Sequence, residues 1–222
     1  MRLYEFEAKE IFKKHGLPVP ESQVVENVQE VVSAFSRLKP AVLKSQVLVG
    51  GRGKAGGIKF PEDGAEAQRY AGDLLSLSIK GYPVRKLLIE KRIPIEKEFY
   101  AGVTIDRSEG RPILLASARG GMDVEEIAKK YPQEMIREKL DVREGLPYYK
   151  SLDFSRKMGL RGKSLMDGAK ILGTLYEIFE RYDAEIVEIN PLVKTADGDL
   201  IAADAKINID DEALWRHPEL RK

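Results

Sequence analysis

"VGGRGKAGGIKF", residues 49–60, carries five glycines with two basic side chains among them. Three of the glycines spell G-x-G-x-x-G, the spacing of the dinucleotide-binding fingerprint. That fingerprint follows a strand and opens directly into a helix. Here AVLKSQV (41–47) predicts the strand, but GIKF (57–60) predicts a second strand where the helix is needed. The stretch therefore does not indicate a Rossmann turn.

The phosphate-binding P-loop is excluded by two positions of the same stretch. That motif needs a glycine where Leu48 stands, and a serine or threonine after Lys54, where Ala55 stands. A glycine-rich loop between two strands is a different device, because it can fold over a triphosphate and offer backbone N–H groups and basic side chains. A mobile hairpin with solvated charges is the other interpretation that the stretch allows.

Composition limits the classes of partner. Thirty-seven basic and 36 acidic residues leave a formal charge of +1, which gives no reason to expect nucleic acid. No apolar run reaches the length of a membrane span, and the N-terminus is charged and amphipathic rather than signal-like. Without cysteine, the chain has no disulfide framework and no thiolate chemistry. We expect a cytoplasmic protein that binds neither nucleic acid nor membrane.

Histidine is scarce as well. The chain holds only His15 and His217, and neither has a nearby serine, aspartate or second histidine in the pattern of a catalytic triad or a zinc site. We expect both to be structural or solvated.

The order of predicted elements indicates an α/β (α+β) chain of two lobes. In the first portion helices alternate with strands, and Asn27 with Glu30 three residues later resembles a capping box. The second portion begins near Glu98 with a hairpin around DRSEGR, continues through two helices, and closes with a hairpin around TADG. A junction at residues 92–98 predicts an active cleft there.

Three charged residues near that junction or the glycine-rich loop are candidate ligand contacts. Lys44 lies among apolar residues, where a lysine is costly to bury without an anion, so it either reaches a phosphate or points outward. Glu90 ends the predicted strand LLIE, and Glu98 follows beyond a link that contains proline. These two carboxylates either hold ribose hydroxyls and an adenine amino group, or are solvated.

The closing hairpin carries a more specific cluster. Glu188 and Asn190 are two residues apart on one strand, hence on one face, and Asp204 lies on the partner strand. Two side-chain oxygens at one point suit Mg²⁺, which completes its shell with water and phosphate. The alternative is a surface hairpin whose polar side chains face water.

The register of this hairpin decides whether the cluster converges. A two-residue turn moves Asp204 to the wrong face of the sheet. A three-residue loop with Gly198 in the left-handed region puts Asn190 opposite Asp204 and Glu188 opposite Lys206. We predict the three-residue loop.

Together these features resemble the ATP-grasp fold, and three motifs resemble one family more closely, the β subunits of succinyl-CoA synthetase. The family's opening is similar to LYEFEAKEIFKKHGLPVP (3–20), and its nucleotide loop is similar to KSQVLVGGRGKAGGIK (44–59). Its metal-binding end is similar to EINPLV (188–193) with GDLIAADAKINIDDEALWRHPELR (198–221). The similarity covers essentially the whole chain, and the second and third motifs are highly specific.

The resemblance implies roles for ten residues. Those that would bind the nucleotide phosphates are Lys44, Gly51, Arg52 and Gly53. Those that would hold the base and ribose are Glu90, Ile93 through its backbone, and Glu98. Asn190 and Asp204 would bind Mg²⁺, and Glu188 matches a catalytic glutamate that faces a phosphohistidine.

The resemblance also implies an acid–thiol ligase of the tricarboxylic acid cycle. Its family converts acyl-CoA, ADP or GDP, and phosphate into the free acid, CoA and ATP or GTP, through an acyl phosphate and a phosphorylated histidine. That histidine and the CoA site lie on an α subunit, in an αβ or α2β2 assembly. The shortage of histidine in this chain agrees, because neither His15 nor His217 is placed for that role.

By the same resemblance, residues 1–222 form one ATP-grasp domain. Its smaller lobe is expected at about 21–97, and its larger lobe at about 98–222 together with the N-terminal helix 1–20. We expect the family's flavodoxin-like CoA-ligase domain to be absent from this chain, which would leave the chain alone incomplete for turnover.

Two departures and two other hypotheses remain. Arg119-Gly120-Gly121 stands where many members have Glu-Gly-Gly, and Leu48-Val49 replaces a His-Ala or similar pair. A ligase for another acid, such as acetate or malate, is one hypothesis, and a non-catalytic nucleotide-binding module is the other. The intact set of candidate phosphate and metal ligands argues against the second.

Overall fold

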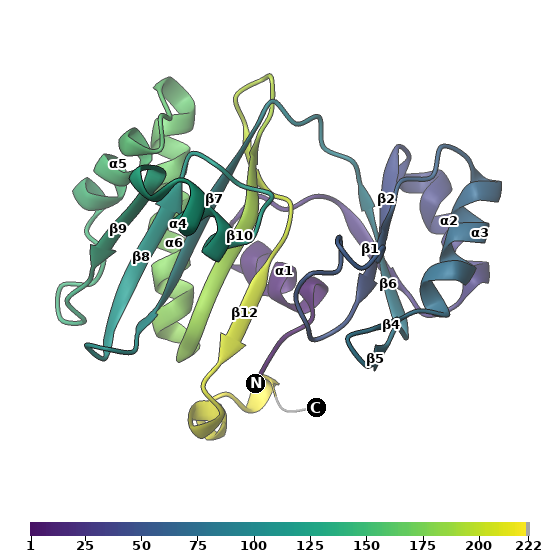
Figure 1. Cartoon of the computed structure of the whole chain (residues 1–222), viewed down its shortest axis with the longest axis horizontal. Coiled ribbons are helices and arrows are strands. Elements are labelled where there is room, and N and C mark those ends of the chain that lie inside the picture. The colour runs from purple at the N-terminus through teal and green to yellow at the C-terminus, as the bar shows by residue number, and fades with distance from the viewer. Residues whose placement is uncertain (221–222) are drawn as a thin grey trace. The chain divides into compact units, whose positions relative to one another are not determined.

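The computed structural model describes residues 1–220 and divides the chain into two compact units, each with its own sheet and core (Figure 1). The smaller unit comprises Tyr4–Phe6 and Pro20–Ile93. The larger unit comprises Met1–Leu3, Glu7–Val19 and the chain from Pro94 onward.

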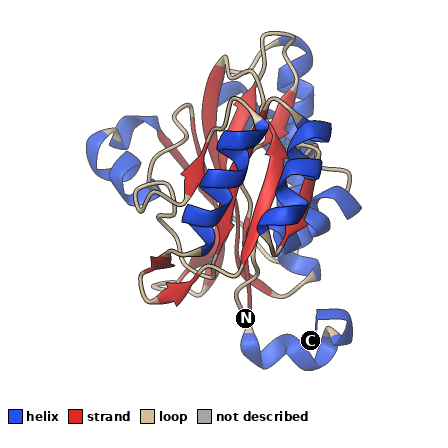
Figure 2. Ribbon diagram, turned by 90° about the vertical axis from the view of Figure 1, so that its right-hand side faces the viewer, coloured by secondary structure: helices blue, strands red, loops and turns tan. Residues whose placement is uncertain are grey.

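The smaller unit is an antiparallel four-stranded sheet in the order β1-β6-β2-β3, with two helices against one face (Figure 2). Its sheet strands are β1 (Ser22–Val25), β2 (Ala41–Gln46), β3 (Ile58–Lys59) and β6 (Lys86–Lys91). Its helices are α2 (Val28–Leu38) and α3 (Gly64–Leu75), and a separate short hairpin joins β4 (Ser78–Ile79) to β5 (Tyr82–Pro83).

Alternation along the strands divides this sheet into an apolar and a polar face. Leu43, Leu87 and Ile89 pack into the core with α2 and α3. Because successive strand residues point to opposite faces, Lys44 and Glu90 lie on the other side, although both remain buried. The smaller unit therefore places charged side chains beneath its surface, on the face away from its helices.

Helix starts in the smaller unit follow the predicted capping chemistry. The Asn27 side chain accepts a hydrogen bond from the backbone N–H of Glu30 at 3.0 Å. The Asn27 amide in turn donates to the Glu30 carboxylate at 2.8 Å. Asp63 caps α3 in the same way, through the N–H of Glu66 at 2.8 Å. The predicted capping box is confirmed.

The larger unit is a six-stranded sheet in the order β11-β10-β7-β8-β9, with β12 also paired to β10. Its strands are β7 (Lys97–Asp106), β8 (Arg111–Ser117), β9 (Met135–Lys139), β10 (Ala184–Lys194), β11 (Leu200–Ala202) and β12 (Lys206–Ile209). Its helices are α1 (Glu5–Lys14, whose first two residues belong to the smaller unit), α4 (Val124–Lys130), α5 (Tyr148–Lys157) and α6 (Gly162–Arg181). Short 3₁₀ helices cover Pro132–Glu134, Asp211–Arg216 and Pro218–Leu220.

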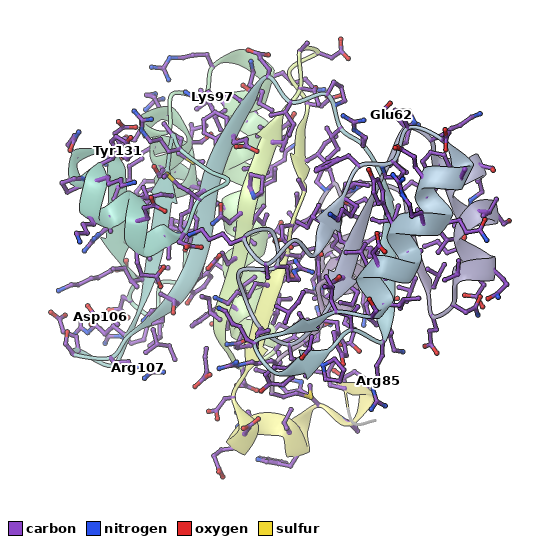
Figure 3. The ribbon with its side chains drawn as sticks, turned by 45° about the vertical axis from the view of Figure 1, so that its right-hand side comes forward. Glu62, Arg85, Lys97, Asp106, Arg107 and Tyr131 are labelled. Atoms are coloured by element: carbon purple, nitrogen blue, oxygen red, sulfur yellow. The ribbon has the colours of Figure 1, made fainter. Side chains whose placement is uncertain are left out.

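The main core of the larger unit lies on the sheet face that contacts α1, α5 and α6. From the central strands, Phe99, Ala101, Val187 and Ile189 join this core. Their sequence neighbours Tyr100 and Glu188 therefore point to the opposite face. The hairpin that was predicted around DRSEGR is present as β7 and β8, with Asp106 and Arg107 at its turn (Figure 3).

The closing hairpin has the predicted register. Gly198 has φ +84°, and its N–H donates to Thr195 O at 2.9 Å, so the loop between Thr195 and Asp199 has three residues. Glu188 pairs with Lys206, as predicted. The return strand is not continuous, however, because residues 203–205 separate β11 from β12.

The C-terminal histidine is structural rather than solvated. His217 is buried, and its Nε2 lies 2.8 Å from an oxygen of Asp183, which also pairs with Arg216. The ring of His217 stacks on Tyr182 with 5.8 Å between centroids. None of the helices described within residues 1–220 combines the length and the apolar character of a transmembrane span.

Candidate functional site

Lys44 and Glu90 form a buried ion pair in the smaller unit. In the β2–β6 ladder Val42 lies opposite Glu90. Lys44, two residues further along β2, is therefore the diagonal neighbour of Glu90 on the same face of the sheet. The ammonium Nζ lies 2.6 Å from Glu90 Oε1, and only 10% and 2% of the two side chains are exposed. Lys44 thus has the anionic partner that a buried lysine needs, and the alternative of an outward-pointing lysine is wrong.

A second carboxylate joins the same network. Glu5 Oε1 accepts from Lys44 Nζ at 3.0 Å, and Glu5 Oε2 accepts from Arg52 Nη1 at 2.6 Å. Arg52 also donates to the backbone carbonyl of Ser45 at 3.2 Å. The two cations predicted to contact phosphate therefore meet in one place, although they are eight residues apart on different elements.

The glycine-rich stretch is an ordered turn between antiparallel strands. Lys44 pairs with Ile58 in the β2–β3 ladder, and the N–H of Ser45 donates to Gly57 O at 2.8 Å. Inside the loop, Gly57 N–H donates to Arg52 O at 2.8 Å. Gly51 and Gly53, on either side of Arg52, are exposed. The predicted strand–loop–strand arrangement is confirmed, and backbone hydrogen bonds hold the side chain of Arg52 at the base of the loop.

Lys54, which was not among the predicted site residues, and the predicted Ile93 differ in their surroundings. Lys54 is exposed in the loop, in contrast to the largely buried Arg52. Ile93 follows β6, is half-buried, and is the last residue of the smaller unit. Its proposed role uses only the backbone, so the side chain carries no information about it.

In the larger unit, two predicted residues meet at a glycine pair. Asn190 Oδ1 accepts from the N–H of Gly121 at 2.9 Å, and its Nδ2 donates to Met122 O at 2.8 Å. A Cβ on Gly121 would lie 2.4 Å from Glu98 Oε2, and Gly121 has φ +72°. A Cβ on Gly120 would lie 2.3 Å from the carbonyl oxygen of Phe99. Only glycines allow this loop to lie so close to β7 and between Glu98 and Asn190.

The neighbouring Arg119 points its charge elsewhere. Its guanidinium lies 3.9 Å from the ring centroid of Tyr131, at the end of α4 (Figure 3), and donates to Glu134 at 2.8 Å. The pairing with Glu134 raises the pKa of Arg119. The departure at this position therefore has a local structural role within the loop.

Asn190 and Asp204 are suitable ligands for Mg²⁺. Ala203 N–H donates to Pro191 O at 3.1 Å on one side of them, and Glu188 pairs with Lys206 on the other, so the backbone register brings positions 190 and 204 opposite each other. Asp204 accepts from the N–H of Ala205 at 2.8 Å. Carboxylate and amide oxygens have several acceptor sites and are the ligands that Mg²⁺ prefers. Within residues 1–220 no group of three or more histidine, aspartate or glutamate side chains could hold a metal ion.

Glu188 is a buried carboxyl group. Burial raises its pKa, an effect that nearby Asp204 reinforces and Lys206 opposes. Lys206 Nζ lies 3.7 Å away and is 54% exposed, which weakens its influence. The Tyr100 hydroxyl donates to Glu188 Oε2 at 3.5 Å, and burial raises the pKa of Tyr100 as well. An acidic hydrogen-bonding group at this position can meet a protonatable partner such as an imidazole.

The structure thus brings Lys44, Arg52 and Glu90 together in the smaller unit, and it places Glu98 and Asn190 beside Gly121 in the larger unit. Sequence reasoning missed Glu5 and Tyr100. Glu5 lies inside the motif that resembles the family's opening, but 39 residues separate it from Lys44. Tyr100 gave no signal beyond a place in a predicted strand, and 88 residues separate it from Glu188.

The fold defines the class of protein to which this chain belongs. The chain belongs to the ATP-grasp domain family, whose model matches residues 2–194. Both the predicted fold and the predicted family resemblance are confirmed. The chain is 44% identical, over 221 residues, to the β subunit of the ADP-forming succinate–CoA ligase of Halorubrum lacusprofundi. That similarity covers 99% of this chain and 58% of its relative, so the chain spans less than two thirds of the relative's length.

Solved structures support the fold at lower identity. A structure of acetyl-coenzyme A synthetase 1 from Ca. Korarchaeum cryptofilum, in complex with coenzyme A and Ca-AMPCP, has a TM-score of 0.75 at 18% identity, covering 94% of this chain and 93% of that one. A second structure of that enzyme contains coenzyme A and Mg-AMPPCP, with a phosphohistidine segment pointing towards the nucleotide binding site. Its TM-score is 0.69 at 17% identity, with the same coverage.

Proposed function

We propose that this chain is the nucleotide-binding ATP-grasp part of an ADP-forming acid–CoA ligase, and that its two units are the two lobes of that domain. The reaction is succinate + CoA + ATP ⇌ succinyl-CoA + ADP + phosphate. The chain exchanges phosphate between Mg-nucleotide and a phosphohistidine carried by an α subunit, which also carries the CoA site. The meeting of Lys44 and Arg52 in one buried network carries the proposal, because two fixed cations are what a nucleotide polyphosphate requires.

In this proposal each unit has a distinct task. In the smaller unit Lys44, Arg52 and the loop N–H groups of Gly51 and Gly53 neutralise and orient the phosphates. Glu90 and the backbone of Ile93 hold the base, with Glu98 of the larger unit on the ribose.

Asn190 and Asp204 of the larger unit hold Mg²⁺, which when bound neutralises charge on the transferring phosphoryl group. Glu188 faces the phosphohistidine of the α subunit. Most of the catalysis would then be positioning and charge stabilisation.

Succinate is the acid that the similarity favours. The relative named as a succinate–CoA ligase β subunit is 44% identical to this chain. The acetyl-coenzyme A synthetase structure is only 18% identical and indicates the fold alone. An activity panel of succinate, acetate and malate, run with the complex reconstituted from this protein and an α partner, tests the choice. Turnover restricted to acetate or malate would overturn it.

Asp204→Ala directly tests the proposed Mg²⁺ site. We expect the variant to bind ADP with an affinity that no longer depends on Mg²⁺, whereas the unaltered chain binds more tightly when Mg²⁺ is present. Isothermal titration with ADP, with and without Mg²⁺, measures this. Asp197→Ala, in the exposed loop of the same hairpin, is the matched control and should keep the dependence. Unchanged Mg²⁺ dependence in Asp204→Ala would mean that the metal lies elsewhere.

A further inference from the structure

Glu5 is a buried carboxylate that the nucleotide site described above does not explain. Its side chain is 1% exposed, and it begins α1. Each of its two oxygens contacts a different cation, Lys44 at 3.0 Å and Arg52 at 2.6 Å. The Gln46 amide adds a third donor, 3.3 Å from Oε2. This carboxylate is therefore bound on both oxygens by the two side chains assigned to phosphate.

The two cations have very different backbone supports. Lys44 projects from the central part of β2, which is paired on both sides. Arg52 projects from the glycine-rich turn, outside the strand ladder. Long basic side chains lose rotamer freedom when a ligand immobilises them, and preorganisation avoids this loss on binding. A single carboxylate that bridges both groups sets the separation of Lys44 Nζ from the Arg52 guanidinium before any ligand arrives.

Glu5 also compensates the positive charges of Lys44 and Arg52. Lys44 and Arg52 are 10% and 11% exposed, Glu90 contacts Lys44, and Glu5 contacts both cations. Buried charges are stable only when they are paired. Glu5 brings a second negative charge into contact with both cations, so the network can remain charged beneath the surface.

We propose that Glu5 is a positioning residue, which holds Lys44 and Arg52 in the arrangement that binds the phosphates of a nucleoside diphosphate. This inference rests on the proposed nucleotide-binding function. Glu5 acts through the two cations and makes no contact with the ligand itself. The opposite role, in which the carboxylate occupies the place of a phosphate and competes with it, predicts the opposite sign of every effect below.

Calorimetric titration with ADP in Mg²⁺ distinguishes the two roles. Glu5→Ala should weaken ADP binding about tenfold, because both side chains must then be ordered by the ligand. Glu5→Gln, which still accepts one hydrogen bond, should weaken it about threefold and so partly rescue binding. Glu10→Gln, exposed on the same helix, is the matched control and should bind as the unaltered chain does.

A double-variant cycle separates positioning from a general loss of structure. If Glu5 acts through Lys44 and Arg52, the loss of ADP affinity in Glu5→Ala/Arg52→Ala should be smaller than the sum of the losses in the two single variants. Additive losses would overturn the proposal, as would unchanged or tighter binding in Glu5→Gln. If Glu5→Ala does not fold, as judged by thermal unfolding, Glu5→Gln decides the question. Failure of the unaltered chain to bind ADP would instead overturn the proposed function, and this inference with it.

Discussion

Lys44 and Arg52 of the smaller unit each lie within 3.0 Å of a carboxylate, whereas in the larger unit the ammonium of Lys206 approaches Glu188 only to 3.7 Å and is half exposed. The first group is a buried network in which cations and anions alternate. The second is a carboxyl group with a raised pKa, beside another carboxylate, Asp204. In the proposed function the first group would bind phosphate and the second Mg²⁺, because phosphate needs fixed cations and Mg²⁺ needs acidic oxygens.

The largest expected effect comes from breaking the buried network. Lys44→Met keeps the apolar stem but leaves Glu5 and Glu90 without their shared ammonium. Removing one member of a buried ion pair costs about 3–5 kcal/mol. We expect the free energy of unfolding of the smaller unit, measured by urea denaturation, to fall by that amount. Lys54→Met, exposed in the glycine-rich loop, should change it by less than about 0.5 kcal/mol. A loss below about 1 kcal/mol for Lys44→Met would show that the network is not buried as described.

In the larger unit we expect the greatest loss of stability from a substitution in the pair Gly120 and Gly121, rather than from a substitution of a charged residue. In Gly120→Ala the new Cβ would meet the backbone of Phe99 at 2.3 Å, and backbone cannot move aside as a flexible side chain can. Overpacking of this kind costs about 1–3 kcal/mol. We expect a lower unfolding temperature and weaker Mg²⁺-dependent ADP binding, because the loop also contacts Asn190.

Gly72→Ala is the matched control for that substitution. No atom lies within 4 Å of a Cβ built on this exposed helical glycine, so the variant should be more stable by about 0.5–1 kcal/mol. Equal effects of the two substitutions would contradict the close contact at Gly120.

The smallest effect is expected where the larger unit keeps an ion pair near its surface. Partial burial of Asp183 raises its pKa, but hydrogen bonds from His217 and Arg216 outweigh this and leave the pKa lowered. A lowered carboxyl pKa contributes stability above the unfolded-state pKa, and the contribution is lost as the pH falls through the folded-state pKa. Asp183→Asn should therefore lower the unfolding temperature at pH 7 by about 2–4 °C, corresponding to about 1 kcal/mol.

The pH dependence is the sharper part of that prediction. As the pH falls through the lowered folded-state pKa, the carboxyl of the unaltered chain becomes protonated, so the difference in unfolding temperature between the two proteins should shrink. Asparagine tolerates the left-handed backbone at this position, where φ is +48°, so the backbone conformation should not change. Asp73→Asn, on an exposed position of α3, is the control. A difference that persists undiminished at pH 2 would show that the ion pair is not its origin.

The structural features that depend only on residues close together in the sequence could be predicted. The register around Gly198 follows from the length of one loop, and the cap at Asn27 follows from residues three apart, so both were predictable. The break between β11 and β12 was not, although Pro191 lacks the N–H that a continuous ladder would use. Lys44 looked equally suited to solvent or ligand because its partner Glu5 lies far away in the sequence.

The same limit applied to the larger unit. Nothing local indicated that Gly121 lies between Glu98 and Asn190, since 69 residues separate it from Asn190. The family resemblance supplied these residues as members of a site, but not the contacts that hold them. Those contacts depend on strand pairing across the sheet, which no local sequence pattern specifies.

Calorimetric titration of the unaltered chain with ADP, first in Mg²⁺ and then in excess EDTA, tests the central claim most directly. That claim is that the cations of the smaller unit bind the phosphates and the oxygens of the larger unit bind the metal. The prediction is saturable binding of one ADP per chain in Mg²⁺, at least about tenfold weaker in EDTA. Absence of binding in both conditions, or equal affinity in both, would contradict the claim.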